Sequence, residues 1–174
     1  MRSIEPDPEA SDGTRAMRYL TKEEYVRRVE GTHENWRNYT GRWHYHQAAI
    51  DWLKQLEPES VLEVGSLGIR LTDRSETLDF NQRWKLDKPD IDYVHDMRDV
   101  PWPVGRYDVV VGLRSFHYCG DKLRAVFDEA SRVGSTVILA LPSDFDISSL
   151  PAPDERLDGL PTRTNLYRWT SGSR

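Results

Sequence analysis

One short segment, residues 60–68, limits the fold of this chain more than any other. It reads SVLEVGSLG, an apolar run that holds one acidic residue and is followed at once by a loop with two glycines. The valines and leucine are typical of a strand that is buried on both faces, as in a parallel sheet. Gly65 and Gly68 permit a sharp turn in which the backbone approaches a ligand closely. Open α/β sheets bind ligands at such places, outside the carboxyl ends of their strands.

Four further strand-like segments follow, at residues 77–80, 92–97, 107–113 and 136–142. Between the last two lies a helical pattern from residue 120 to residue 133. Its apolar residues recur at i, i+3, i+4 and i+7 and form one stripe: Leu123, Val126, Phe127 and Ala130. Strands that alternate with helical segments indicate an α/β fold with a parallel sheet and right-handed crossovers.

The order and spacing of five segments resemble those of class I S-adenosylmethionine-dependent methyltransferases: VLEVGSLG, TLDF, YVHDMRDVPWPVGRYDVVVGLRSFHY, a helix ending in DEASRV, and TVILALP. The resemblance covers about residues 45–142. Its most specific part is the acid, the short proline-bounded loop and the run YDVVV. It implies a Rossmann-like, mostly parallel sheet of strand order 3-2-1-4-5, to which we add one C-terminal strand at most. It also implies S-adenosylmethionine as the cofactor and methyl transfer as the activity.

The resemblance assigns cofactor binding to residues that end or follow the first four strands: Glu63, Gly65, Ser66, Gly68, Asp79, Asp96, Met97 and Leu113. It implies that Glu63 and the glycine loop face the methionine end of the cofactor, and that Asp79 accepts hydrogen bonds from the ribose hydroxyls. Asp96 would meet the exocyclic amine of the adenine, with Met97 as an apolar wall for the ring. The alternative for each acid is a solvated residue at the end of a loop, because Asp and Glu are usually exposed.

Residues 113–117, after the fourth strand, are implied to line the place where the methyl acceptor meets the sulfonium. His117 is the first candidate for the general base, because a histidine needs little pKa tuning to act near neutral pH. A histidine that flanks a helix without a catalytic part is the alternative. Arg114 is a candidate for binding an anionic acceptor through a bidentate contact. The sequence GLRS stands where base-amine methyltransferases carry Asn/Asp-Pro-Pro-Tyr, so we expect a small-molecule or sugar hydroxyl or carboxyl acceptor.

Aromatic and histidine residues crowd the segment before the first strand: His33, Trp36, Tyr39, Trp43, His44, Tyr45 and His46. In the family, residues in this place often cover the cofactor, so His44 and Tyr45 are candidate substrate-binding residues. Packing of the N-terminal helices onto the sheet is the favoured interpretation for most of the rings. His44 and His46 point about 200° apart on a helix and are weaker candidates for the base. With one cysteine in the chain, we expect no metal site.

The region after the glycine loop departs from the family. Only residues 69–76 separate this loop from the second strand, and a helix of three turns needs about eleven residues. We therefore expect the first crossover helix to be shortened or absent, with N-terminal residues covering the face that it leaves. Leu67 and Ile69 also occupy places where the family commonly has glycine. These departures favour one alternative, a methyltransferase-like protein that binds S-adenosylmethionine or a nucleoside without catalysis. A second alternative is a module that binds a protein partner through exposed aromatic residues near the N-terminus.

Composition limits the partners and the location. The net charge of −5 argues against electrostatic capture of nucleic acid. Cys119 is the only cysteine, so it forms no internal disulfide, and we interpret it as a small apolar residue in a reducing compartment. No apolar run approaches the ~20 residues of a membrane span, and the acidic N-terminus is unlike a signal peptide. We expect a cytoplasmic protein without a membrane or nucleic-acid partner.

The 174 residues suit one domain. We predict a mobile segment at 1–20 and a methyltransferase-like domain at 21–174. This domain comprises N-terminal helices at 21–58, a Rossmann-like core at 59–142 and an extension at 143–174 whose only strand candidate is 165–170. Thr21 and Glu24 match a capping box at the first helix, and the second helix is expected from about 42 to 56. A trimmed sheet leaves edges that would favour a homodimer.

Overall fold

A seven-stranded sheet forms the centre of the computed structural model, which describes residues 15–32, 40–80, 91–171. The strands are β1 (Val61–Val64), β2 (Ser75–Asp79), β3 (Tyr93–Val94), β4 (Tyr107–Leu113), β5 (Gly134–Pro142), β6 (Glu155–Leu160) and β7 (Thr164–Thr170). Their order is β3-β2-β1-β4-β5-β7-β6. The first five are mutually parallel, and β7 pairs antiparallel with both β5 and β6. The predicted order 3-2-1-4-5 and the α/β Rossmann-like class are confirmed.

The C-terminal extension corrects one prediction. We expected one strand at most after residue 142, and the chain forms two, β6 and β7. Strand β7 is largely buried between β5 and β6, as its sequence TNLYRWT suggests. Strand β6 lies at the sheet edge and is exposed along most of its length. An edge strand with no buried face carries no apolar alternation, so its sequence ERLDGL gave no signal.

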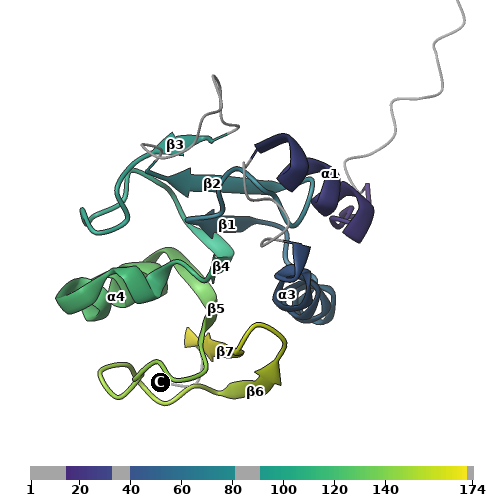
Figure 1. The fold of residues 1–174 in the computed structure, drawn as a ribbon. Helices are drawn as coiled ribbons and strands as arrows, with labels where there is room; N and C mark the ends of the chain where they lie inside the picture. The colour runs from purple at the N-terminus through teal and green to yellow at the C-terminus, as the bar shows by residue number, and fades with distance from the viewer. Residues whose placement is uncertain (1–14, 33–39, 81–90, 172–174) are drawn as a thin grey trace, which may run out of the picture.

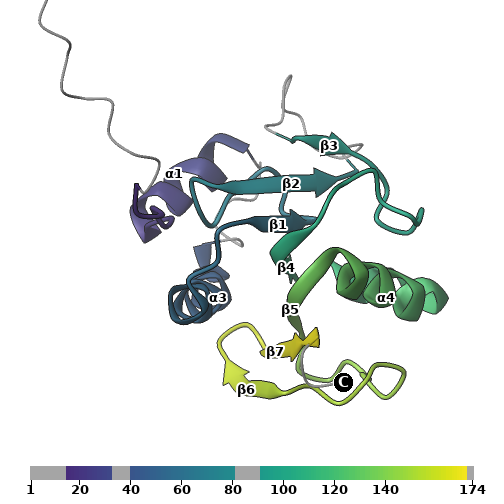
Figure 2. The ribbon, with the colours of Figure 1, turned by 180° about the vertical axis from the view of Figure 1, so that it is seen from behind.

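Helices cover the two faces of the sheet (Figures 1 and 2). Helices α1 (Lys22–Thr32) and α3 (Trp43–Leu56) lie on one face, and α4 (Leu123–Val133) lies on the other. The predicted capping box of α1 is present: Thr21 Oγ1 accepts from Glu24 N at 3.2 Å, and Glu24 Oε2 accepts from Thr21 N at 2.9 Å. Two hydrophobic clusters result, one between the sheet and α4 and one between the sheet and the N-terminal helices.

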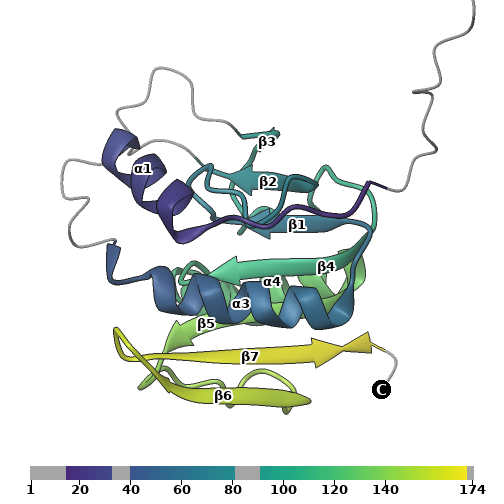
Figure 3. The same cartoon turned by 90° about the vertical axis from the view of Figure 1, so that its right-hand side faces the viewer.

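The first crossover is a loop. Residues 65–74 form turns, and no helix lies between Val64 and Ser75, as predicted. Helix α1 and the residues before it cover this part of the sheet (Figure 3). Residues 18–20 run antiparallel to residues 71–73: Leu20 N donates to Leu71 O at 2.8 Å, and Asp73 N donates to Arg18 O at 2.9 Å. The apolar stripe of the missing helix is thus replaced by chain from elsewhere in the sequence.

Part of what the sequence suggested lies outside the described residues. Residues 1–14, most of the segment predicted to be mobile, are not among them, and neither are His33, Trp36 and Tyr39. Within the described ranges, no helix is both long and apolar enough to cross a bilayer.

Candidate nucleoside-binding site

A pocket of about 820 Å³ opens at the carboxyl ends of β1, β2 and β4. This volume lies within the range of small-molecule sites, about 300–1,000 Å³. It collects nine of the twelve predicted site residues: Tyr45, Glu63, Gly65, Ser66, Asp79, Asp96, Met97, Leu113 and Arg114. The parallel pairing of β2, β1 and β4 brings these residues together, because the carboxyl ends of parallel strands meet at one edge of a sheet.

Gly65 lines the pocket and lies close against neighbouring chain. Its φ is +72°, and its N–H donates to Leu78 O at 2.9 Å, which extends the ladder between β1 and β2. A Cβ atom at this position would lie 2.5 Å from the Cβ of Ser115 and 3.1 Å from the Cε of Met97. The Ser115 hydroxyl in turn donates to Val64 O at 2.8 Å. Only glycine fits here, because Ser115 and Met97 occupy the space that a side chain would need.

Asp79 holds the glycine loop in place. Its carboxylate accepts from Leu67 N at 2.7 Å and from Phe80 N at 2.7 Å. Leu67 has a φ of +60°, so a leucine adopts the left-handed conformation at a position where the family commonly has glycine. Burial raises the pKa of Asp79, and the two backbone donors oppose this rise. Asp79 therefore lines the pocket and also compensates for the lost glycine.

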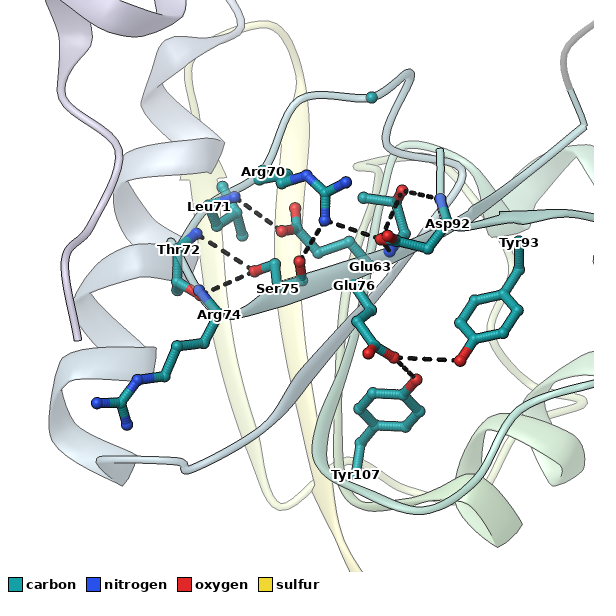
Figure 4. Close-up of polar contacts among 12 residues, drawn as sticks. Glu63, Arg70, Leu71, Thr72, Arg74, Ser75, Glu76, Asp92, Tyr93 and Tyr107 are labelled. Atoms are coloured by element: carbon teal, nitrogen blue, oxygen red, sulfur yellow. Dashed lines mark hydrogen bonds and ion pairs between the residues drawn. The ribbon is translucent and has the colours of Figure 1, made fainter. Parts of the chain in front are cut away.

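Glu63 performs a similar task one strand away. It is 3% exposed, and its Oε2 accepts from Leu71 N at 2.7 Å (Figure 4). Burial raises its pKa to about 7, although hydrogen bonds from Ser75 and Leu71 oppose the rise. Glu63 is the last residue but one of β1. Its side chain contacts Leu71 in the second half of the loop and also lines the pocket.

An ion pair that the sequence did not suggest connects the loop between β1 and β2 to the residue before β3. Arg70 Nη1 lies 2.8 Å from Asp92 Oδ2 and donates to Ser75 O at 2.5 Å (Figure 4). Asp92 directly precedes β3, and its carboxylate also accepts from Thr77 N at 2.8 Å. Ion pairs between residues 22 positions apart leave no periodic signal, so only the fold reveals them.

Asp96 and Met97 follow β3 at the opposite side of the loop. The Asp96 carboxylate pairs with Arg98, whose Nη2 lies 2.7 Å from Oδ2, and this contact lowers the pKa of Asp96. Met97 O accepts from the indole of Trp102 at 2.8 Å, which fixes the backbone here. Met97 Sδ lies 3.5 Å from the thiol of Cys119. Burial raises the pKa of Cys119 to about 11, so this residue is a neutral thiol that packs as an apolar side chain.

Helix α3 and the segment after β4 form the remaining wall. Arg42, Tyr45 and His46 line the pocket from the start of α3. His46 Nδ1 lies 2.9 Å from Arg42 O. Because a carbonyl only accepts, Nδ1 carries the proton and Nε2 keeps the lone pair. Burial lowers the pKa of His46 to about 4, so the ring is neutral near pH 7.

Three predicted residues do not line this pocket. His44 is exposed on α3, and Gly68 turns away, with its carbonyl 3.4 Å from Arg28 Nη2. The ring of His117 packs against Tyr118, 3.9 Å between centroids, and against Phe145. Its Nδ1 is buried without a hydrogen-bond partner among the described residues, and burial lowers its pKa to about 4. In the same described part of the chain, no three His, Cys, Asp or Glu side chains gather closely enough to hold a metal ion.

Several solved methyltransferases share this fold, although no protein-family model and no curated protein sequence matches the chain. Magnesium protoporphyrin IX methyltransferase from Synechocystis PCC 6803, solved with S-adenosylmethionine, superposes with a TM-score of 0.58 at 11% identity over 85% of this chain and 90% of its own. The N-methyltransferase NodS from Bradyrhizobium japonicum WM9, in complex with S-adenosylhomocysteine, gives 0.55 at 12% identity over 86% and 97%. The methyltransferase domain of bacterial CtHen1 gives 0.54 at 12% identity over 74% and 98%. The chain therefore has the fold of the class I S-adenosylmethionine-dependent methyltransferases.

Proposed function

We propose that the protein binds S-adenosylmethionine in this pocket and transfers its methyl group to a hydroxyl or carboxyl of a small molecule. One observation carries the proposal: Glu63, Asp79 and Asp96, which belong to three adjacent parallel strands or the residues just after them, line a single pocket. The solved methyltransferases with S-adenosylmethionine or S-adenosylhomocysteine bound support the choice of ligand.

The residues of the pocket fit this cofactor. The hydroxyl of Ser66 is buried and has no hydrogen-bond partner among the described residues, so it can donate to and accept from a bound ligand. Gly65 presents bare backbone to the pocket. The carboxyl groups are complementary to a cofactor with a positive sulfonium and ammonium, and Met97 offers an apolar wall to a purine. Asp79 keeps acceptor capacity beyond its two backbone donors, because an ionised carboxylate has about four lone-pair sites.

When bound, S-adenosylmethionine supplies an electrophilic methyl group on sulfur. The chain must then position the acceptor and take up its proton. We assign the proton-accepting role to His46 in place of His117, because His46 lines the pocket and its free lone pair is on Nε2. Its lowered pKa keeps it unprotonated at neutral pH, although it also makes the ring a weaker base.

Calorimetry tests the cofactor assignment. Wild-type protein is titrated with S-adenosylmethionine and S-adenosylhomocysteine, and we expect Asp79→Ala to weaken binding by about 1–3 kcal/mol through lost charge-assisted hydrogen bonds. Asp121→Asn, an exposed carboxyl outside the pocket, is the control and should leave the affinity unchanged. If neither ligand binds the wild type at millimolar concentration, the proposed function is wrong.

A labelled-methyl assay against cell extract tests catalysis. We expect the wild type to label an extract component, and His46→Gln to lose most of this activity while it still binds S-adenosylhomocysteine. His44→Gln changes the same residue type on the same helix but on the exposed side, so it should keep its activity. Equal activity of the two variants would remove His46 from the mechanism.

A binding protein without catalysis is the second candidate. The absent crossover helix and Leu67 at a glycine place favour it, because both lie beside the methionine end of the proposed ligand. The carboxylates of Glu63 and Asp79 are also already engaged by backbone N–H groups of the loop. Binding of S-adenosylhomocysteine without labelled product in any extract would favour this candidate.

A further inference from the structure

The pocket has opposite charges on its two sides. Asp79 ends β2 and Asp96 follows β3, where the nearby Arg98 is paired with Asp96. Arg114 follows β4, on the other side of β1, and Arg42 lines the pocket from the start of α3. Both arginines line the same pocket, and their positive charges add to burial, the main cause, in lowering the pKa of the His117 ring.

Arg114 is held in place by hydrogen bonds and has no acidic partner among the described residues. Its backbone has a φ of +58°, a strained value for a residue other than glycine. Its Nη1 lies 3.3 Å from Thr164 Oγ1 and 3.5 Å from Arg163 O, which directs the guanidinium along the start of β7. No carboxylate among the described residues comes within 4.0 Å of it. A half-buried guanidinium beside a pocket, without an acidic partner, is suited to an anionic ligand.

We propose that the methyl acceptor is an anion, and that Arg114 with Arg42 binds its carboxylate or phosphate group. The inference rests on the proposed function and names its substrate class. A planar guanidinium binds either group with two parallel hydrogen bonds, which fixes the acceptor's orientation as well as its charge. The acids beside β2 and β3 repel the same anion, so the acceptor and the positively charged cofactor occupy opposite sides of the pocket.

Weak binding of defined anions to the complex with S-adenosylhomocysteine tests the proposal. Inorganic phosphate and benzoate are titrated at constant ionic strength and followed by the melting temperature and by NMR, with benzamide as the neutral analogue of benzoate. We expect one of the two anions to bind with a dissociation constant in the millimolar range, and benzamide at least about tenfold more weakly. Arg114→Gln and Arg42→Gln should each weaken the anion at least about fivefold. Arg106→Gln, an exposed arginine remote from the pocket, should not.

The outcomes separate this inference from the proposed function. If S-adenosylhomocysteine binds but neither anion responds to Arg114→Gln, or benzamide binds as well as benzoate, the acceptor class is wrong and the cofactor assignment stands. If S-adenosylhomocysteine fails to bind but the anion still depends on Arg114, the anion site stands and the proposed function is wrong. Preference for phosphate or for benzoate decides which anion the acceptor carries.

The carboxylate of the cofactor's own methionine tail is the competing anion. 5′-Deoxy-5′-methylthioadenosine lacks this tail, so a comparison with S-adenosylhomocysteine isolates it. We expect Arg114→Gln to change the affinity for both ligands by less than about twofold. A selective loss for S-adenosylhomocysteine would place Arg114 on the cofactor and overturn the inference.

Discussion

The two crossovers that flank the centre of the sheet both connect parallel strands, but different structures cover the sheet and different interactions stabilise the chain. Between β4 and β5 the chain uses helix α4, whose apolar stripe covers one face of the sheet. Between β1 and β2 it uses a loop of ten residues, and helix α1 with residues 18–20 covers the other face. The helix is held by backbone hydrogen bonds and apolar packing. The loop is held by the carboxyl groups of Glu63 and Asp79 and by the ion pair of Arg70 with Asp92.

This difference shows what a crossover helix contributes to such a fold. Its covering of the sheet can be supplied by chain from elsewhere, but its regular hydrogen bonding cannot. A short loop without helical bonds leaves backbone N–H groups that must find other acceptors. Here buried acids at the pocket supply them, so two residues that we propose bind the cofactor also stabilise the fold. Substitutions in the loop should therefore affect stability and ligand binding together, whereas substitutions in helix α4, which does not line the pocket, should affect stability alone.

The largest effect is expected at Gly65. Gly65→Ala places a Cβ 2.5 Å from Ser115 Cβ at a positive φ, and we expect a loss of about 3 kcal/mol in unfolding free energy together with loss of S-adenosylhomocysteine binding. Gly120→Ala in the helical crossover also has a positive φ, +59°, but open space around it. It should cost only about 1 kcal/mol and leave binding intact. Similar losses for the two variants in urea unfolding would contradict the geometry of the loop.

The next effect is a pH dependence at Glu63. Its pKa is about 7 in the folded state, against the ordinary glutamate value of 4.5, so the folded state binds the proton more tightly. The resulting stabilisation is complete below pH 4.5 and is lost as the pH rises through 7. Between pH 5 and pH 8 we expect the wild type to lose about 2–3 kcal/mol relative to Glu63→Gln, which has no proton to lose.

The comparison with Glu63→Gln is needed because two histidines act in the opposite direction. His46 and His117 have pKa values lowered to about 4, so they destabilise the folded state as the pH falls from 6.5 toward 4. They are present in both proteins and cancel in the difference. Urea unfolding at pH 5, 6.5 and 8 measures it, and parallel pH profiles for the two proteins would show that Glu63 is not buried as described.

A smaller effect is expected from the ion pairs of the two crossovers. Arg70 and Asp92 are 24% and 36% exposed, whereas Arg124 and Asp128 on α4 are 54% and 55% exposed. Arg70→Met should cost about 1 kcal/mol after allowance for solvent screening, and Arg124→Met about 0.3–0.5 kcal/mol. Each arginine also donates to a backbone carbonyl, so the two substitutions remove similar sets of contacts. Chemical denaturation of both variants at low and high salt checks the order, and an equal cost would mean that the loop needs no ionic support.

The smallest effect is expected at Leu67. Leu67→Gly removes the backbone strain of a leucine at positive φ, which stabilises the folded state by about 1 kcal/mol. It also raises the conformational entropy of the unfolded chain, which destabilises the folded state by a similar amount. The unfolding free energy should therefore change by less than about 1 kcal/mol. Leu123→Gly in α4 removes a side chain that is 5% exposed and should cost at least about 3 kcal/mol. A comparable loss at Leu67 would mean that its side chain, and not its backbone, matters.

Burial decides how much of the fold the sequence revealed. Strand β4 was predicted with its observed bounds because Tyr107–Leu113 is largely buried and apolar along its length. Strand β3 was predicted over 92–97 but spans only Tyr93–Val94, since Asp92 turns its carboxylate to the loop and Asp96 turns back to Arg98. Tertiary contacts, not local preferences, set these limits.

The candidate site shows the same division. The motif order placed nine residues on one pocket, but it did not distinguish neighbours on a helix. In the 3-10 helix Phe116–Tyr118, three residues per turn put Ser115 and Tyr118 on the pocket side and leave His117 elsewhere. On α3, spacing of three and four residues brings Tyr45 and His46 to the pocket with Arg42, and leaves His44 in solvent. The helical phase relative to the sheet was the missing information.

The antiparallel pairing of residues 18–20 with residues 71–73 has a practical consequence for anyone who shortens this chain. All described residues that line the pocket lie at or beyond Tyr25, so an expression clone beginning at Thr21 would keep every one of them. This clone would nevertheless lack the residues whose backbone bonds to Leu71 and Asp73. Leu71 matters for the pocket because its N–H donates to the Glu63 carboxylate. Such a trimmed protein should bind nucleosides more weakly than the full chain. A shortened clone should therefore start before Arg18, whose carbonyl accepts from Asp73 N.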